Sequence, residues 1–341
     1  MASARTDTVV SAGADALEGE YRVLVEGCGV VDRSQRGKLA LTGEGALEFL
    51  GGQVTNELNP LRPGTGCYAA FLTHKGKMLG DLRILAVGDD EDASGHAPGA
   101  PAALLLDTER VALQGLFDMI RRFKVGYDVE LHKRTVERGL LSLVGPDAAA
   151  IAGAQALAEA EHANAPMEID GIAALAVRTD VGIDLICAAA STPALSAALD
   201  ARGAPAISEQ AAECLRVERG RPRYGVDLDD TVIPQEAGLN ERAVSFTKGC
   251  YVGQETVARL HYKGKPNRHL RGLRLSAPAA PGDELRLGER PVGRVGSAVL
   301  SPRLGPIALA LVRREAAPGS TVSVGEHGAS AEVLELPFPA G

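Results

Sequence analysis

The chain has 341 residues, of which 45% are apolar and 23% are charged, as is typical of a soluble globular protein with two or three domains. Its net charge of −8, from 44 acidic and 36 basic residues, argues against a general nucleic-acid-coating protein, although a local basic strip could still bind an anion. No apolar run approaches the roughly 18 residues needed to cross a bilayer. The N-terminal segment also lacks the apolar core of a signal peptide, so we expect a cytoplasmic protein with no membrane partner.

The sequence of the first third of the chain predicts one unit built of strands and helices. Residues 1–20 are small and polar, and we expect them to be frayed. We then expect a strand over 36–43, a short helix within 44–54 that stops at Gly51–Gly52, and a hairpin over 67–87 that turns at Lys75–Gly76. The acidic, Gly- and Pro-rich stretch 88–101 predicts a disordered surface loop. A strand over 103–108 and an amphipathic helix over 109–123 follow.

A second α/β passage and a barrel complete the chain. The second passage predicts a strand over 139–145, a helix over 146–163, strands over 172–180 and 182–188, and a helix over 192–203. From Lys263 onward, short strands alternate with Gly and Pro turns and no helical period remains, a pattern typical of a small antiparallel barrel. We therefore expect an α+β protein with one domain over 1–265 and a barrel domain over 266–341.

The five cysteines indicate free thiols. No two of them have C-x-x-C spacing, so we predict no metal site made by the cysteines of this chain alone. Cys28, Cys187 and Cys214 lie among apolar residues and are expected in the core. Cys250 differs, because "KGCYVGQE" (248–255) sets it beside Lys248 and ahead of a predicted helix, and both features stabilise a thiolate. The alternative is a small buried residue in a tight turn.

Two polar stretches suggest anion or ring recognition. In "LRVERGRPRYGVD" (215–227), Leu215 and Val217 would face a core if the segment were extended, with Arg216 and Glu218 on the other side. A carboxylate such as Glu218 can accept two hydrogen bonds from a pterin edge, or it can merely neutralise neighbouring arginines. "RLHYKGKPNRHLRGLR" (259–274) is a basic strip that suits a polyanionic tail, an RNA phosphate or a solvated linker.

Several motifs in this order resemble a known family. "EFLGGQVTNELNPL", "FLTHKGKMLGDLRI", "LRVERGRPRYGVD", "PQEAGLN", "KGCYVGQET" and "PVGRVGSAVLSPRLGPIALALVR" closely resemble the YgfZ family of folate-binding proteins. That family is related to the T-protein, the aminomethyltransferase of the glycine cleavage system. The resemblance begins near residue 36 and reaches the C-terminus, and its most specific part is the KGC-Y-x-GQE stretch.

The resemblance implies a fold, a ligand and a role. The fold would be a three-part cloverleaf around a hole for tetrahydrofolate or a one-carbon derivative. The role would be accessory, in assembling or repairing iron–sulfur clusters of client enzymes, including those that modify tRNA. Folate contacts are expected from residues along the matched motifs: Asp81, Glu218, Arg223, Tyr224, Glu236 and Gln254. Cys250, assisted by Lys248, would carry the chemistry, either by sulfur or redox reactions or by holding a transient iron–sulfur cluster shared with a partner.

One departure bears on the choice between these relatives. T-proteins resemble GG-x-x-DDL where this chain has "GKMLGDL", so the acidic pair becomes Gly80–Asp81. T-proteins also lack a cysteine at the position of Cys250. Both differences favour thiol chemistry near folate over aminomethyl transfer. We also expect Gly80→Asp to leave the fold intact.

Three functional hypotheses follow. The first is the folate-binding iron–sulfur accessory factor. The second is a one-carbon enzyme that transfers a methylene group between an amine and tetrahydrofolate. The third is an RNA-binding adaptor, which the net charge of −8 and the 4% of aromatic residues disfavour.

Overall fold

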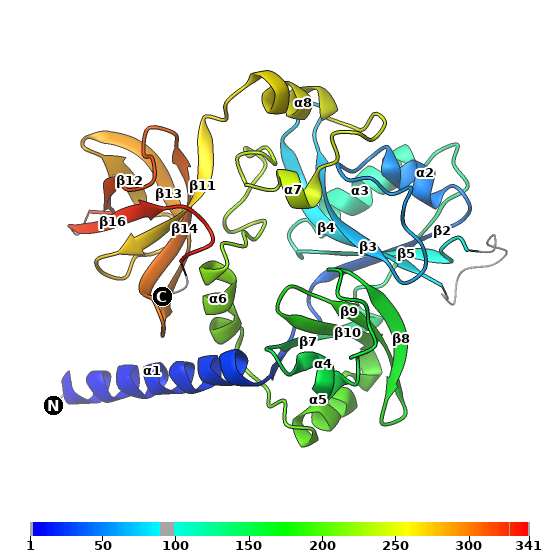
Figure 1. The fold of residues 1–341 in the computed structure, drawn as a ribbon, viewed down its shortest axis with the longest axis horizontal. Helices are drawn as coiled ribbons and strands as arrows, with labels where there is room; N and C mark the ends of the chain where they lie inside the picture. Colours follow the sequence, from blue (N-terminus) through cyan, green and yellow to red (C-terminus); the bar gives the residue numbers. More distant parts are fainter. Residues whose placement is uncertain (1–2, 89–98, 327, 340–341) are drawn as a thin grey trace.

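The computed structural model is built from two sheet-containing lobes, a barrel and a helix that runs between them (Figure 1). It describes residues 3–88, 99–326 and 328–339, with side chains from residue 15 onward. The α+β class and the C-terminal barrel expected from the sequence are confirmed. Most of the predicted 88–101 loop, residues 89–98, lies outside the described residues.

The first lobe is a five-stranded antiparallel sheet in the order β3-β4-β5-β2-β6. Its strands are β2 (Gly37–Thr42), β3 (Gly66–Leu72), β4 (Met78–Val87), β5 (Ala103–Thr108) and β6 (Glu130–Lys133), and its helices are α2 (Ala46–Gly51) and α3 (Leu113–Phe123). The predicted hairpin is confirmed, because β3 pairs with β4 across a turn in which Gly76 takes a left-handed φ of 75°. Phe49, Phe71 and Met78 lie in the core between sheet and helices.

The second lobe is another five-stranded sheet, in the order β1-β7-β10-β9-β8. Its elements are β1 (Gly29–Asp32), β7 (Arg138–Val144), α4 (Ala148–Ala152), β8 (Asn164–Ile169), β9 (Ile172–Arg178), β10 (Gly182–Ala188), a short 3₁₀ turn (Ala189–Ser191) and α5 (Thr192–Ala201). The helix predicted over 146–163 is wrong beyond its first turns. Gly153 takes a left-handed φ of 73° and ends α4, so the alanine-rich segment after it forms turns despite its high helix propensity.

The helices α1 and α6 also correct the sequence predictions. Residues 1–20 are not frayed throughout, since α1 spans Ser3–Glu26. Leu17, Tyr21 and Leu24 recur at helical spacing and pack against α6 (Glu209–Glu218). The segment containing Leu215 and Val217 is therefore helical and not extended. The helix α6 begins where the Ser208 hydroxyl accepts a hydrogen bond from the Ala211 N–H.

The chain leaves α6 through a long irregular segment that carries two short helices, α7 (Asn240–Ala243) and α8 (Gln254–Lys263). It then enters the closed antiparallel barrel β11-β14-β13-β12-β15-β16. The barrel strands are β11 (Arg268–Leu275), β12 (Glu284–Leu287), β13 (Arg290–Ser301), β14 (Gly305–Arg313), β15 (Thr321–Val324) and β16 (Ala329–Leu334). In Figure 1, α6 lies between the barrel and the two lobes, so three separate units meet around it. No helix in the described ranges has the length and apolar character needed to span a membrane.

Candidate functional site

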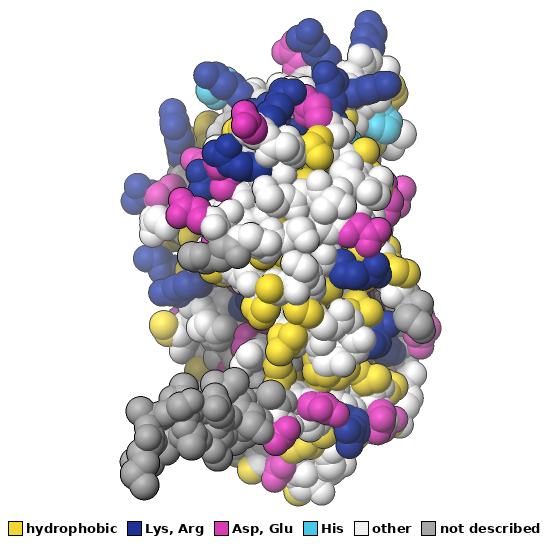
Figure 2. Space-filling model, turned by 90° about the vertical axis from the view of Figure 1, so that its left-hand side faces the viewer, with side chains coloured by type: hydrophobic (Ala, Val, Ile, Leu, Met, Phe, Trp, Pro, Cys, Tyr) yellow, Lys and Arg dark blue, Asp and Glu magenta, His cyan; other side chains and the backbone are white. Residues whose placement is uncertain are grey.

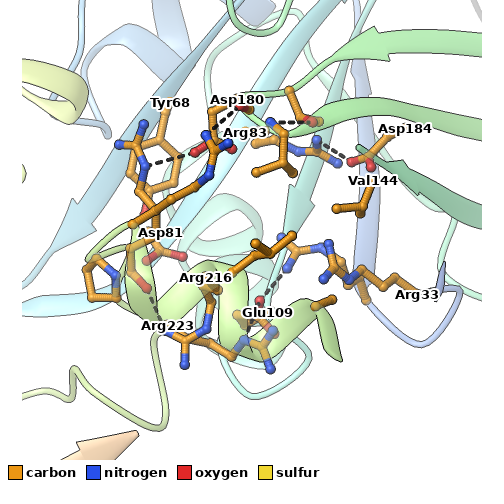
Figure 3. A pocket seen from close by; sticks show the side chains of 18 of the residues that line it. Arg33, Tyr68, Asp81, Arg83, Glu109, Val144, Asp180, Asp184, Arg216 and Arg223 are labelled. Atoms are coloured by element: carbon orange, nitrogen blue, oxygen red, sulfur yellow. Dashed lines mark hydrogen bonds and ion pairs between the residues drawn. The ribbon is translucent and has the colours of Figure 1, made fainter. Parts of the chain in front are cut away.

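The two lobes and α6 line a central cavity of about 250 Å³. The first lobe contributes Tyr68 from β3 and Asp81 from β4, and the second lobe contributes Val144 and Asp184 (Figure 3). Arg216 extends from α6, and the segment that follows it adds further residues. The wall is thus assembled from segments far apart in the sequence.

Asp81 is the one carboxylate lining this cavity, among the described residues, with no arginine within ion-pairing distance. Its neighbour on the same face of the sheet is Tyr68, since β3 pairs Ala70 with Asp81, and the Tyr68 hydroxyl acts to lower the pKa of the Asp81 carboxyl. Asp81 is only 5% exposed, and burial raises its carboxyl pKa to about 6. Burial and the nearby carboxylate raise the pKa of Tyr68 well above 10. Asp81 can therefore exchange a proton near neutral pH.

The other carboxylates around the cavity are paired with arginines. Arg83 bridges the lobes, with Nη1 2.6 Å from Asp184 of the second lobe and Nε 2.7 Å from Asp107 of the first. Arg36 also donates to Asp107, at 2.8 Å, and to Glu109. These two guanidinium groups hold the pKa of Asp107 at about 2 against the opposing effect of burial. Asp81 is therefore the cavity carboxylate without an arginine partner among the described residues.

Arg223 and Tyr224, predicted as folate contacts, both line the cavity. The Arg223 guanidinium contacts Glu209 at 2.9 Å and Glu213 at 2.6 Å, and so ties the segment after α6 back to that helix. Tyr224 is buried, with its hydroxyl 3.5 Å from the Met78 carbonyl.

Glu218, the predicted pterin contact, lies beside a different cavity. This second cavity, of about 530 Å³, is bounded by α1, α6, the barrel and the C-terminal tail, and shares wall residues such as Leu215 and Arg219 with the central one. The buried Glu218 carboxylate accepts hydrogen bonds from the Tyr21 hydroxyl at 2.9 and 3.0 Å, from Arg303 at 3.0 Å and from Ser301. Both of its oxygens are therefore engaged within the protein, and a pterin would have to displace one of these donors.

The residues predicted around Cys250 do not line the central cavity. Cys250 is exposed, and α8 begins four residues later at Gln254, as predicted. The Lys248 ammonium is buried and donates to the carbonyls of Gly51, Val54 and Asn56 at 2.6–2.8 Å. Lys248 thus clamps the loop after α2.

Glu236 and the basic strip (259–274) lie where the barrel joins the remainder of the protein. Arg268 donates to both oxygens of Glu236, at 2.9 and 3.2 Å. Arg271 and Arg274 pair with glutamates of β16 or the residue after it. Lysine and arginine side chains gather at the upper end of the molecule in Figure 2, the end at which α8 lies in Figure 1. Arg268, Arg271 and Arg274 of the strip therefore form ion pairs within or next to the barrel.

No group of three or more His, Cys, Asp or Glu side chains in the described part of the chain is arranged to hold a metal ion.

Comparison with known proteins explains this architecture. Residues 10–248 match the GCVT N-terminal domain, and residues 268–339 match the glycine cleavage T-protein C-terminal barrel domain. The chain belongs to the GcvT family. YgfZ proteins are GcvT-like, so the resemblance read from the sequence is shown at this broader level.

Relatives of this GcvT-family chain include proteins named aminomethyltransferase. The one from Streptomyces coelicolor is 30% identical, covering 91% of this chain and 86% of the relative. The one from Corynebacterium jeikeium is 29% identical, covering 94% and 89%. A chloroplastic protein of Arabidopsis thaliana named as a transferase is 29% identical, covering 91% and 71%. The solved aminomethyltransferase of Bartonella henselae has the same fold, with a TM-score of 0.80 at 23% identity over 95% of this chain and 89% of that one.

The fold also shows that a side chain at position 80 would point into the core and not into the cavity. A Cβ atom at position 80 would lie 2.6 Å from the Phe71 ring and 2.6 Å from the Ala112 Cβ, inside the core. Asp81, the next residue on the strand, faces the opposite way and lines the cavity. The acid missing at position 80 therefore removes no group from the cavity, and Gly80→Asp would bury a carboxylate against an aromatic ring. The expectation that this substitution leaves the fold intact conflicts with this packing.

Sequence reasoning missed Tyr68, His162 and Arg242, which line the cavity with Asp81. Tyr68 carried a usable signal, because residues two apart on a strand share a face and β3 pairs Ala70 with Asp81. The sequence around His162 and Arg242 gives no such indication, because the apolar residues there do not recur with the period of a helix or a strand.

Proposed function

We propose that the chain binds tetrahydrofolate in the central cavity and transfers a one-carbon unit between an amine and that folate. The observation that carries this proposal is Asp81, a buried carboxylate whose pKa lies near neutrality in a cavity where the other acids are neutralised by arginines. General acid–base catalysis is most efficient when the pKa of the catalytic group lies near the working pH. The names of the relatives fit this second hypothesis from the sequence more closely than they fit the first.

The side chains present suit a folate. Tyr68 and Tyr224 contribute aromatic side chains to the cavity wall, and Leu215 and Val181 contribute apolar ones. Arg219 and Arg221, near the shared wall of the two cavities, supply positive charge for a ligand carboxylate. The central cavity alone is slightly below the usual range for small-molecule sites, about 300–1,000 Å³, and the cavity of about 530 Å³ shares wall residues with it.

Each residue has a defined task in this proposal. When bound, tetrahydrofolate supplies the nitrogen that carries the one-carbon unit. Asp81 accepts a proton at a carboxylate oxygen, and the Tyr68 hydroxyl stabilises the ionised carboxylate. The contacts of Arg223 and Tyr224 hold the segment after α6 in place along the cavity wall.

Separate binding and turnover measurements test the proposal. Calorimetry with tetrahydrofolate measures binding, and turnover is measured with an aminomethylated carrier as donor. We expect Asp81→Asn to retain folate affinity within about threefold, a change of under 1 kcal/mol, and to lose about 10²- to 10⁴-fold in turnover. Asp118→Asn, at an exposed position of α3, is the matched control and should behave as wild type. Absence of folate binding by the wild type would refute the site, and binding without turnover would refute the transfer reaction.

The exposed thiol supports a second candidate function. As a cytoplasmic accessory factor, the protein would assist assembly or repair of iron–sulfur clusters in partner enzymes, including tRNA-modifying ones, with Cys250 as the reacting group. Of the five cysteines, four are buried or half-buried and Cys250 is exposed. Iodoacetamide should therefore label Cys250 first, and Cys250→Ser should impair iron–sulfur enzymes in cells while retaining folate binding. Full enzyme activity in cells carrying Cys250→Ser would exclude this candidate.

A further inference from the structure

His162 occupies an unusual position next to the central cavity. It lies in the second lobe, two residues before β8, and only 6% of it is exposed. Its φ of 71° is left-handed, a conformation that few residues other than glycine adopt. Its buried Nδ1 has no hydrogen-bond partner among the described residues. Strained backbone and an unsatisfied buried atom at one residue are costly, and such features concentrate at functional sites.

The first lobe is shaped to admit His162. A Cβ atom at Gly66 of β3 would lie 2.9 Å from the His162 carbonyl oxygen and 3.0 Å from its Cβ. Backbone bonds hold the two segments together, because the Asn164 N–H donates to the Gly64 carbonyl at 2.8 Å. His162 is therefore fixed across the junction between the lobes.

Its ring packs against Tyr68, the neighbour of Asp81. The two ring centroids are 6.5 Å apart and the planes are inclined by 26°. The Arg242 guanidinium also lies over the Tyr68 ring, 4.9 Å from its centroid. Glu161 joins these two neighbours, since it pairs with Arg242 and lies 3.7 Å from the His162 Nε2.

His162 is uncharged across the working range. Burial lowers its pKa to about 3, and the positive charges of Arg83 and Arg242 act in the same direction. An imidazole with this pKa does not carry a proton in turnover near neutral pH. What it offers Tyr68 is a flat, neutral ring in a fixed position.

We propose that His162 is a positioning residue, whose ring holds the Tyr68 hydroxyl within reach of Asp81 across the junction between the lobes. The catalytic consequence rests on the proposed function, because it requires Asp81 to accept a proton. The positioning of Tyr68 by His162 does not rest on the proposed function, because it concerns only where Tyr68 lies relative to Asp81.

Two substitutions separate the ring from the rest of the residue. His162→Asn keeps a side chain that tolerates left-handed backbone and removes the ring. His162→Phe keeps a ring and removes both nitrogens. Asp170→Asn is the control, because Asp170 also has a positive φ, of 50°, but lies in an exposed turn away from the cavity.

The main readout is the titration of the Asp81 carboxyl carbon by NMR in the full chain, identified as the signal absent from Asp81→Asn. The Tyr68 hydroxyl lowers the pKa of Asp81, while the other charged neighbours, Arg36, Asp107 and Glu109, are untouched by the substitutions. We expect His162→Asn to raise the Asp81 midpoint by about one pH unit, the value of one hydrogen bond to a charged group. His162→Phe should restore the midpoint, and Asp170→Asn should leave it unchanged.

Turnover supplies the second readout. His162→Asn should lower kcat about 10- to 100-fold with little change in KM, because misplaced catalytic groups slow the chemical step, and His162→Phe should recover most of it. An unchanged midpoint in His162→Asn overturns the proposal, as does a shift that His162→Phe fails to reverse. If His162→Asn does not fold, His162→Gln takes its place in the same comparison. The titration needs no turnover, so failure of the proposed reaction and failure of this proposal give different results.

Discussion

At the scale of single residues, the site depends on a carboxylate that the fold does not neutralise. Arg36 and Arg83 pair with Asp107, and Arg83 also pairs with Asp184, whereas Asp81 forms no ion pair among the described residues. An ionised carboxylate buried in this way costs stability, because burial disfavours its charged form. A role of the Asp81 carboxylate in the proposed reaction would explain why the protein has this destabilising group in the cavity.

Asp81→Asn should therefore stabilise the protein in a pH-dependent manner. The pKa of Asp81 is about 6 in the folded state against 3.8 when unperturbed, so the folded protein binds the proton more tightly and loses stability as pH rises from about 4 through 6. We expect Asp81→Asn to gain about 1–3 kcal/mol in free energy of unfolding at pH 7.5 and almost nothing at pH 4. Urea unfolding at the two pH values measures this difference. An equal gain at both would mean that the charge of Asp81 is not responsible.

The sequence located part of the site for identifiable reasons. Asp81, Arg223 and Tyr224 belong to motifs with distinctive composition, and they do line the cavity. The family resemblance assigns Glu218 to the pterin by its place in the motif, and only the fold reveals Tyr21, Ser301 and Arg303 around its carboxylate. His162 could not be found, because its position depends on how one lobe meets the other.

At the scale of secondary-structure elements, strands were easier to predict than helices. Alternation and turn residues located β2, β5 and the β3–β4 hairpin well. Pro146 favours a helix start and the segment 146–163 is predicted to be helical throughout, but the left-handed Gly153 ends the helix early. The helix α1 was missed because its apolar positions, Leu17 and Leu24 among them, gain their stability only by packing on α6.

The docking of α1 should depend on Tyr21. Its buried hydroxyl donates to Glu218, and burial together with that carboxylate raises the pKa of Tyr21 to about 12. Tyr21→Phe removes a hydrogen bond to a charged group, which should weaken docking of α1 by about 1–2 kcal/mol. Amide exchange over residues 17–26 should then accelerate roughly 5- to 30-fold. Arg22→Met, which removes an exposed ion pair with Glu18, is the control and should change exchange little. Equal exchange rates in Tyr21→Phe and wild type would show that apolar packing alone holds α1.

At the scale of the whole molecule, buried ions join the lobes. Arg83 lies on β4 of the first lobe and contacts Asp184 on β10 of the second. Strand pairing cannot supply this connection, because the two sheets are separate. The relative position of the lobes therefore depends on these buried ion pairs together with the apolar cluster that Leu85 of β4 forms with Leu140 of β7 and Ile186 of β10.

Arg83→Met should destabilise the protein strongly. It leaves Asp184 without the partner that neutralises it and deprives Asp107 of one of two, and breaking a buried pair costs about 3–5 kcal/mol. Arg274→Met removes an exposed pair with Glu332 and should cost at most about 1 kcal/mol. Denaturant unfolding of both variants measures the contrast. Similar losses in the two would indicate that water reaches the Arg83 network and screens it.

The division of the cavity wall among distant segments also has a consequence for synthesis of the chain. Asp81 and Tyr68 leave the ribosome early, but α6 and the residues after it, which close the cavity, are made much later. The highest-numbered residue of the cavity wall is Arg242. A nascent chain can thus fold its first sheet while the central cavity still lacks part of its wall, so a complete binding site forms only after Arg242 has been made.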